Sequence, residues 1–168
     1  METNNNQQRN ENSETPSNRS QLIEKFDELV ILIERGNWLA LAALLEKEEY
    51  RKVINFKDPH DNGFGLIHYS AKRNDPECIR VVVENQWCDR NLKDNFGRSG
   101  LHILISGKCR CHVCTEKAKT CIQLVINNGG DANIEDHNRK TPLCYAVEKF
   151  LSQYAILLLN MGASLHVE

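Results

Sequence analysis

Three cysteines and one histidine fall within a stretch of six residues: Cys109, Cys111, His112 and Cys114. Zinc takes four such ligands in a tetrahedron, so the stretch has the residue types of a metal site. Adjacent Cys111 and His112 have difficulty binding one ion together, which leaves Cys109, Cys111 and Cys114 as candidate zinc ligands. A fourth ligand would come from Cys121 or from a partner. The alternative is a redox-sensitive or unpaired surface loop, and both interpretations stay open.

Motifs of catalytic and nucleotide-binding sites are not found in the sequence. Gly63-Phe64-Gly65 lacks the third glycine of a dinucleotide loop, and six residues separate Gly100 from Gly107-Lys108 where a phosphate loop has four. The adjacent carboxylates of Glu48 and Glu49 lie in a run of mixed charge, which is typical of a solvated surface. We therefore expect no enzyme, and no cofactor beyond the zinc considered above.

Composition restricts the partners and the compartment. The formal charge of −2 gives no whole-molecule attraction to nucleic acid or anionic lipid. Apolar runs are far shorter than the roughly 18 to 20 residues of a membrane-spanning helix, and the N-terminal residues lack the apolar centre of a secretory signal. Seven cysteines without an export signal favour reduced thiols or metal ligands over a disulfide framework. We expect a protein of the cytoplasm or the nucleus, with neither nucleic-acid nor membrane partners.

The chain divides once. Residues 1–20 are rich in Asn, Gln, Ser and Glu and hold no large apolar side chain after Met1, so they predict a disordered polar tail. Residues 21–168 carry short apolar stripes of helical period that recur at nearly constant intervals, which predicts one repeat domain.

Three segments of this domain align with one another. They begin at Gly65, Ser99 and Thr141, which are 34 and 42 residues apart, or one period of 33 with insertions of one and nine. Each is followed by an apolar triplet such as Leu157-Leu158-Leu159. The second stripe of each unit opens at a good helix start, namely Asn37, Asp75-Pro76 or the region of Ser152.

The pattern resembles the ankyrin repeat, whose motif contains Thr-Pro-Leu-His and later a leucine pair and Gly-Ala. Thr141-Pro142-Leu143, Leu158-Leu159 and Gly162-Ala163 are its best match here. The resemblance implies an all-α solenoid of helix-turn-helix units with β-turn fingers. Its units are a degenerate cap at about 24–57 and full units at about 58–93, 94–135 and 136–168, with an insertion at about 107–115.

The resemblance also assigns structural roles to the remaining histidines and cysteines. His68 and His102 hold the motif's histidine position, where imidazole bonds to neighbouring backbone. Four cysteines are most simply small core residues: Cys78, Cys88, Cys121 and Cys144. The apolar columns, for example Leu41, Ile79, Ile122 and Ala155, would stack unit upon unit.

Ankyrin modules bind proteins through the turn tips and the exposed side of the first helices. The matching positions here are Asp61, Asn62, Phe64, Lys72, Arg73, Asn95, Phe96, Arg98, His137, Asn138, Lys140, Glu148 and Lys149. Five of these are basic and two acidic, which predicts a positive face and a partner with an acidic patch. Phe64 and Phe96 are expected as exposed aromatic anchors, with the alternative that either ring folds back over its turn.

Three functions are compatible with these observations. The first is a non-catalytic regulatory subunit or inhibitor of a larger complex, with a cell-cycle protein kinase as the expected target, because small ankyrin-only proteins are similar to inhibitors of cyclin-dependent kinases. The second is an inhibitor of a Rel-type transcription factor. The third is a zinc-dependent interaction module that uses the insertion containing Cys109 to Cys114.

Overall fold

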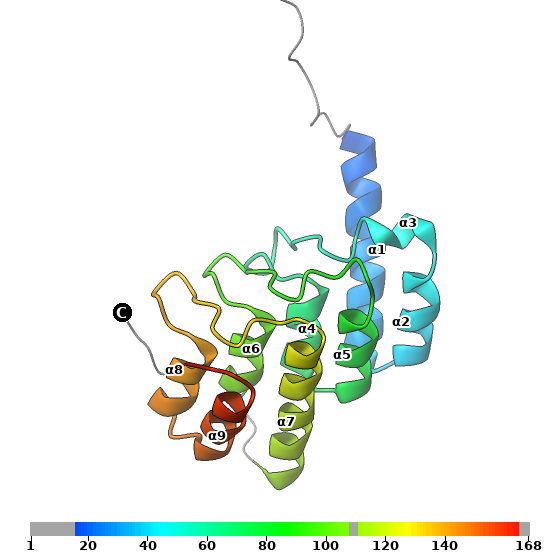
Figure 1. Cartoon of the computed structure of the whole chain (residues 1–168). Coiled ribbons are helices and arrows are strands. Elements are labelled where there is room, and N and C mark those ends of the chain that lie inside the picture. Colours follow the sequence, from blue (N-terminus) through cyan, green and yellow to red (C-terminus); the bar gives the residue numbers. More distant parts are fainter. Residues whose placement is uncertain (1–15, 108–110, 165–168) are drawn as a thin grey trace, which may run out of the picture.

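A computed structural model describes residues 16–107 and 111–164 of the chain (Figure 1). Within these ranges the secondary structure is helical without strands, which confirms the predicted all-α class. In chain order the helices are α1 (Pro16–Arg35), α2 (Trp38–Leu45), α3 (Glu48–Arg51), α4 (Leu66–Arg73), α5 (Pro76–Val83), α6 (Gly100–Ser106), α7 (His112–Asn127), α8 (Pro142–Glu148) and α9 (Ser152–Asn160).

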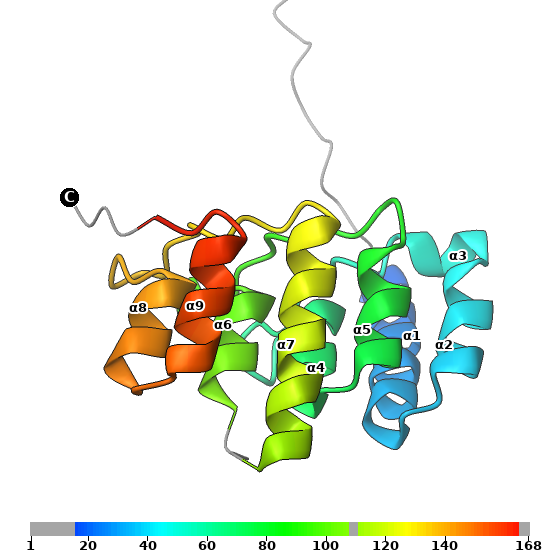
Figure 2. The same cartoon turned by 60° about the horizontal axis from the view of Figure 1, so that its bottom comes forward.

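The helices stand in two parallel rows. α1, α4, α6 and α8 form one row, in which each helix packs on the next. α2, α5 and α7 form the second row, and α9 follows them while packing mainly on α8 (Figure 2). Each helix of the first row also packs on its successor in the chain, so the units are helical hairpins arranged in single file. This is the predicted solenoid.

Local sequence signals explain where several helices begin. The Asn37 side chain accepts a hydrogen bond from the Ala40 N–H at the start of α2. Asp75 accepts one from the Glu77 N–H, and Pro76 occupies the first turn of α5, where its missing N–H costs nothing. The helix starts predicted at Asn37 and Asp75-Pro76 are therefore confirmed.

In three of the units, the turn between the paired helices contains a residue with a left-handed backbone. Gly36, Asn74 and Phe150 occupy this position with φ of 70°, 58° and 55°. Glycine adopts this conformation freely and asparagine does so with moderate cost, whereas a phenylalanine there is strained. The Phe150 side chain is 94% exposed, so packing does not compensate for the strain.

The core consists of the predicted apolar columns. Leu41, Ile79 and Ile122 are fully buried in the second row of helices, as are Val82 and Val125 in the adjoining column. Burial falls off in the last described unit, where Ala155 is half-buried and Leu159 is 40% exposed. In a single-file repeat a unit is packed only by its neighbours, and the last described unit has a described neighbour on one side.

The first helix begins earlier than the sequence predicts. α1 starts at Pro16, so residues 16–20 of the predicted tail are helical. Phe26, Leu29 and Ile33 anchor this helix in the core, and an anchored helix extends by single residues at little cost once its first turn exists. Residues 1–15, which make up the rest of the predicted tail, lie outside the described residues.

Among the described residues, every helix is too short or too polar to span a lipid bilayer.

Candidate functional site

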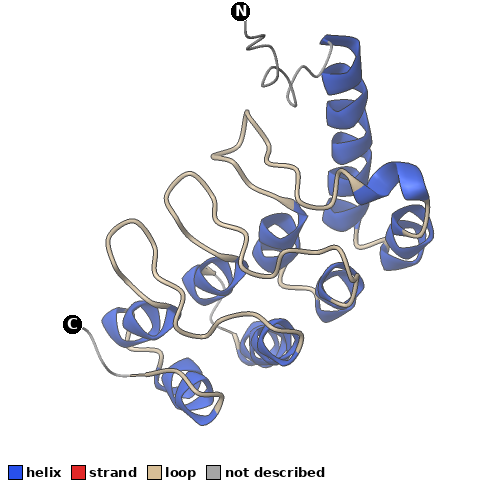
Figure 3. Ribbon diagram, turned by 45° about the horizontal axis from the view of Figure 1, so that its top comes forward, coloured by secondary structure: helices blue, strands red, loops and turns tan. Residues whose placement is uncertain are grey.

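Three loops project from the same end of the helical rows and form a series of fingers (Figure 3). Each finger is closed at its base by a backbone hydrogen bond. Asp58 N–H donates to the Phe64 carbonyl at 2.8 Å, and the second and third fingers have the equivalent bonds, from Asp94 to Arg98 at 2.9 Å and from Asp136 to Lys140 at 3.0 Å. We call the residues 58–64, 94–98 and 136–140 fingers one, two and three.

An aspartate at the base shapes each of the last two fingers. Asp94 Oδ1 accepts hydrogen bonds from the backbone N–H groups of Phe96 and Arg98, at 2.9 and 2.8 Å. Asp136 does the same for Asn138 and Lys140. Burial by itself raises the pKa of Asp136, but the hydrogen bonds that it accepts outweigh burial and leave the pKa below its ordinary value.

The fingers are joined to one another through their backbones. Asn95 N–H donates to the Asn62 carbonyl at 2.8 Å, and His137 N–H donates to the Phe96 carbonyl at 3.0 Å. The close approach depends on Gly97, whose φ is +77° and whose position leaves no room for a side chain, because a Cβ would lie 2.6 Å from the His137 nitrogen. The tips of the fingers are therefore held in a fixed row.

Two buried histidines tie each unit to the next finger. His68 Nδ1 accepts a hydrogen bond from Gly65 N–H at 3.0 Å, and its Nε2 donates to the Arg98 carbonyl at 2.9 Å. His102 makes the equivalent bonds to Ser99 N–H and to the Lys140 carbonyl. Burial lowers the pKa of both imidazoles, so the neutral ring is the stable form. The structural role predicted for these histidines is confirmed.

Phe64 and Phe96, the two candidate aromatic anchors, differ in their exposure. Phe64 is only 6% exposed and stacks on His68 with ring centroids 5.3 Å apart, so its predicted exposure is wrong and the alternative, a ring folded back over its turn, holds. Finger one is two residues longer than the others, which moves Phe64 from the tip to the closing position that Arg98 and Lys140 hold in the other fingers. Phe96 lies at the tip of finger two and is 51% exposed, as predicted.

The predicted positive face is largely neutralised by ion pairs. Four of its five cations have a carboxylate partner, with nitrogen to oxygen distances of 3.7 Å for Lys72 and Asp61, 3.3 Å for Arg73 and Asp75, 2.7 Å for Arg98 and Asp94, and 2.6 Å for Lys140 and Glu148. Counting charged residues in the sequence misses this, because pairing depends on neighbours brought together by folding. Ion pairing therefore reduces the positive charge that the sequence predicts for this face.

The remaining predicted residues separate into two groups. Asn62, Asn95, His137 and Asn138 are exposed in the row of finger tips beside Phe96. Arg73 instead donates to the Glu34 carbonyl of α1, so it holds the first helix rather than facing a partner. Lys149 follows α8 at the end of that helix away from finger three.

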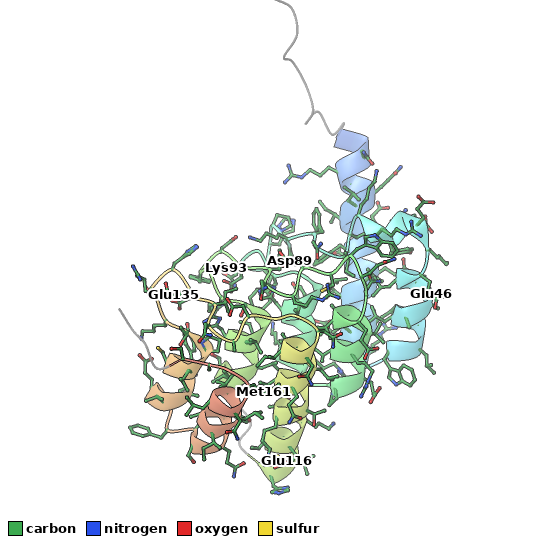
Figure 4. The ribbon with its side chains drawn as sticks, viewed as in Figure 1. Glu46, Asp89, Lys93, Glu116, Glu135 and Met161 are labelled. Atoms are coloured by element: carbon green, nitrogen blue, oxygen red, sulfur yellow. The ribbon has the colours of Figure 1, made fainter. Side chains whose placement is uncertain are left out.

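Sequence reasoning missed several residues of the finger region. Tyr69 and Tyr145 donate hydrogen bonds from their hydroxyls to Asp58 and Asp136, at 2.6 and 2.8 Å, and thereby brace fingers one and three. Lys93 Nζ donates to the Glu135 carbonyl at 2.7 Å, between neighbouring units (Figure 4). The recurrence of Asp and Tyr at similar separation in two units is a signal that could have revealed the tyrosines.

The insertion lengthens a helix. α7 has 16 residues where α2 and α5 have eight, and it begins at His112 with Cys111 as its N-cap. Cys109 lies outside the described residues. Within the described ranges, no group of three or more His, Cys, Asp or Glu side chains is arranged to hold a metal ion. The sequence reasoning also overlooked that Cys111 and Cys114 form a C-x-x-C pair.

The other cysteines belong to the packing, as predicted. Cys78, Cys88 and Cys121 are buried, and burial raises the pKa of their thiols to about 11, 12 and 12. Cys144 is half-buried and its sulfur accepts a hydrogen bond from the Thr141 hydroxyl at 3.3 Å. The raised pKa keeps the thiols of Cys78, Cys88 and Cys121 neutral and makes them poor nucleophiles.

Comparison with known proteins agrees with the fold. The family described as "Ankyrin repeats (3 copies)" matches residues 67–168. "Ankyrin repeat domain-containing protein 53" of Mus musculus is 25% identical over 107 residues, which cover 64% of this chain and 19% of the relative. The protein of the same name from Macaca fascicularis is 33% identical over 89 residues, which cover 53% of this chain and 17% of the relative. "Ankyrin repeat and SOCS box protein 6" of Mus musculus is 28% identical over 119 residues, covering 71% and 26%. The matches thus span about a quarter or less of each relative.

Proposed function

Because the chain belongs to the ankyrin repeat family, whose repeats are protein-protein interaction modules, we propose that it is a non-catalytic regulatory subunit or inhibitor of a larger protein complex. The finer proposal is that the complex contains a cell-cycle protein kinase and that the protein works in the cytoplasm or the nucleus. The observation that carries the proposal is the exposed ring of Phe96 in a rigid row of finger tips.

Phe96 has the properties of an interface anchor. Its ring is half exposed, and the backbone on both of its sides is fixed by hydrogen bonds, from Phe96 N–H to Asp94 and from His137 N–H to the Phe96 carbonyl. The Arg98 guanidinium lies 4.9 Å from the ring centroid and is itself fixed by Asp94. A ring that is already held in position loses little conformational entropy on binding, which favours affinity.

The charges beside the ring favour a partner with an acidic patch, as a finer proposal. The pairs of Lys72 with Asp61 and of Lys140 with Glu148 are exposed, and exposed pairs contribute only about 0 to 1 kcal/mol. A partner carboxylate can therefore replace Asp61 or Glu148 at small cost. Arg98 cannot exchange its carboxylate partner in this way, because the Asp94 carboxylate to which it is paired is fully buried. Any acidic contact would then be made through the lysines.

Affinity capture with a single exposed residue changed tests this proposal. We expect the Phe96→Ala variant to capture at least tenfold less partner than the unchanged protein, since truncating an anchor typically costs about 2 kcal/mol or more of binding free energy. The control is Ile156→Ala, which removes an apolar side chain of similar exposure, 59%, on α9 away from the fingers. Both variants should unfold at the same temperature as the unchanged protein. Equal capture by the two variants would show that the finger tips are not the binding surface.

The identity of the captured proteins separates the finer proposals. A protein kinase that is recovered with the unchanged protein and lost with Phe96→Ala supports the kinase proposal. A Rel-type transcription factor with the same dependence on Phe96 supports the second function considered. That alternative is weaker, because the inhibitors of this class usually cover a basic localisation signal whereas the lysines here favour acidic groups.

A further inference from the structure

The first turn of α7 carries two cysteines in a defined arrangement. Cys111 is the N-cap, with φ of −66° and ψ of 157°, and its sulfur accepts a hydrogen bond from the Cys114 N–H at 3.4 Å. Residues three apart in helical geometry have Cα atoms about 5 Å apart. A disulfide spans Cα distances of roughly 4.4 to 6.8 Å, so this spacing lies within the range that a disulfide between the two cysteines requires.

The surroundings of the pair differ from those of the core cysteines. Cys111 is exposed and Cys114 is half-buried, whereas Cys78, Cys88 and Cys121 are buried. Cys114 lines a cavity of about 200 Å³ together with Arg73, Lys117 and Tyr154. The partial positive charge at the start of a helix of 16 residues favours a thiolate, and Lys117 of the cavity acts in the same direction.

A polar contact fixes the pair to the rest of the molecule. Asn74 Nδ2 donates to the Cys114 carbonyl at 2.8 Å, which connects the start of α7 to the turn between α4 and α5. Asn74 Oδ1 is buried beside the same cavity and has no hydrogen-bond partner among the described residues. A small polar molecule with a donor group would satisfy this oxygen, which is an observation independent of the cysteine spacing.

We propose that Cys111 and Cys114 form a thiol-disulfide exchange site whose substrate is a low-molecular-weight disulfide of the glutathione type. The exposed Cys111 thiolate attacks one sulfur of the substrate, whose S–S bond breaks and releases one thiolate that takes up a proton. Cys114, as a thiolate, then attacks the Cys111 sulfur in the mixed disulfide and displaces the second substrate thiol. The pair loses two electrons and two protons, and the substrate disulfide becomes two thiols.

Oxidised glutathione is the probe for this proposal. The purified full chain is incubated with it, quenched in acid, alkylated and analysed by peptide mass spectrometry. We expect one intramolecular disulfide between Cys111 and Cys114. Cys114→Ser should stop at a mixed disulfide on Cys111 that carries one glutathione, because the resolving thiol is gone. Cys111→Ser should react at least about tenfold more slowly, because the remaining thiol is less exposed.

Cys109→Ser is the matched control, since it removes a cysteine of the same insertion that is not part of the C-x-x-C pair. It should form the Cys111 to Cys114 disulfide at an unchanged rate. A disulfide that includes Cys109, or no intramolecular disulfide at all, would overturn the proposal. About one zinc ion per purified chain, lost in Cys111→Ser and Cys114→Ser, would also overturn it, because thiolates bound to zinc do not exchange freely, and would establish the metal site instead.

Discussion

His68 and His102 make the stability of the protein depend on pH. Each ring is buried and neutral, with Nδ1 accepting from its own unit and Nε2 donating to the next finger. Protonation would place a charge in the core and turn Nδ1 from an acceptor into a donor that faces an N–H group. The pKa of both residues therefore lies below that of an unfolded histidine, which is about 6.5.

The sign of the effect follows from proton binding. Below a pH of about 6.5 the two histidines bind protons in the unfolded chain but remain neutral in the folded chain. The unfolding free energy therefore falls as the pH falls. We expect a decrease of up to about 1.4 kcal/mol per pH unit for each histidine between roughly pH 6.5 and 5. Urea unfolding at a series of pH values measures it.

His102→Gln provides the comparison for this slope. The variant should be less stable at pH 7 but should show about half the slope of the unchanged protein below pH 6.5. The carboxylates whose pKa is lowered, such as Asp58 and Asp136, lose stability only nearer to their own range around pH 4, so they do not account for it. A slope that is the same in both proteins would contradict the assignment.

At the scale of an element, the turn between α8 and α9 places a bulky residue, Phe150, in the left-handed region. Gly36 and Asn74 occupy the equivalent turns, and both residue types tolerate a positive φ. Phe150 does not, and its exposed side chain makes no packing contact that would offset the strain. Backbone strain of this kind is often retained where a residue serves a function.

We expect Phe150→Gly to stabilise the protein by about 0.5 to 1 kcal/mol. The strain released in the folded state exceeds the free-energy cost of the greater conformational entropy that glycine gives the unfolded chain. Lys149→Gly is the control, since its φ of −94° is ordinary and glycine there should destabilise. Thermal and urea unfolding of both variants are the measurements. Destabilisation by Phe150→Gly would show that the ring packs on the protein in solution.

The elements that the sequence predicts correctly are those set by local chemistry. Asn37, Asp75 and Thr141 mark helix starts because their side chains bond to N–H groups two or three residues away, and the apolar columns follow from period alone. Such signals need no knowledge of the rest of the fold. They are sufficient to place most of the repeats.

What the sequence could not predict depends on long-range geometry. Phe64 is buried because two additional residues in finger one shift it toward His68, and no local signal shows where an insertion is absorbed. The cations of the predicted face are neutralised by residues such as Asp94 that carry their own backbone contacts. The sequence therefore locates the finger residues but does not show which of their charges are paired.

At the scale of the whole molecule, burial of the second-row helices is lower in the last described unit than in the middle of the stack. α5 lies between α2 and α7 and buries Cys78, Ile79, Val82 and Val83. α9 packs mainly on α8, buries only Tyr154 and Leu158, and leaves Ile156 exposed. In a single-file repeat each unit is held by its neighbours alone, so a helix with fewer neighbours opens more often.

Hydrogen exchange detects this gradient. We expect amides of α9 to exchange at least about tenfold faster than those of α5. Leu158→Ala should accelerate exchange in α9 and leave α5 unchanged, whereas Ile122→Ala should accelerate it in both, because its cavity lies inside the stack. Equal protection of the two helices would mean that the molecule opens only as a whole.

The doubled length of α7 separates two regions of the molecule. The helix extends roughly 24 Å, so its first turn, near Glu116, lies at the opposite extremity from the fingers around Lys93 and Glu135 (Figure 4). A partner protein bound at the finger tips would therefore leave Cys111 accessible to a small disulfide. Partner binding and oxidation of Cys111 can take place at the same time and in either order.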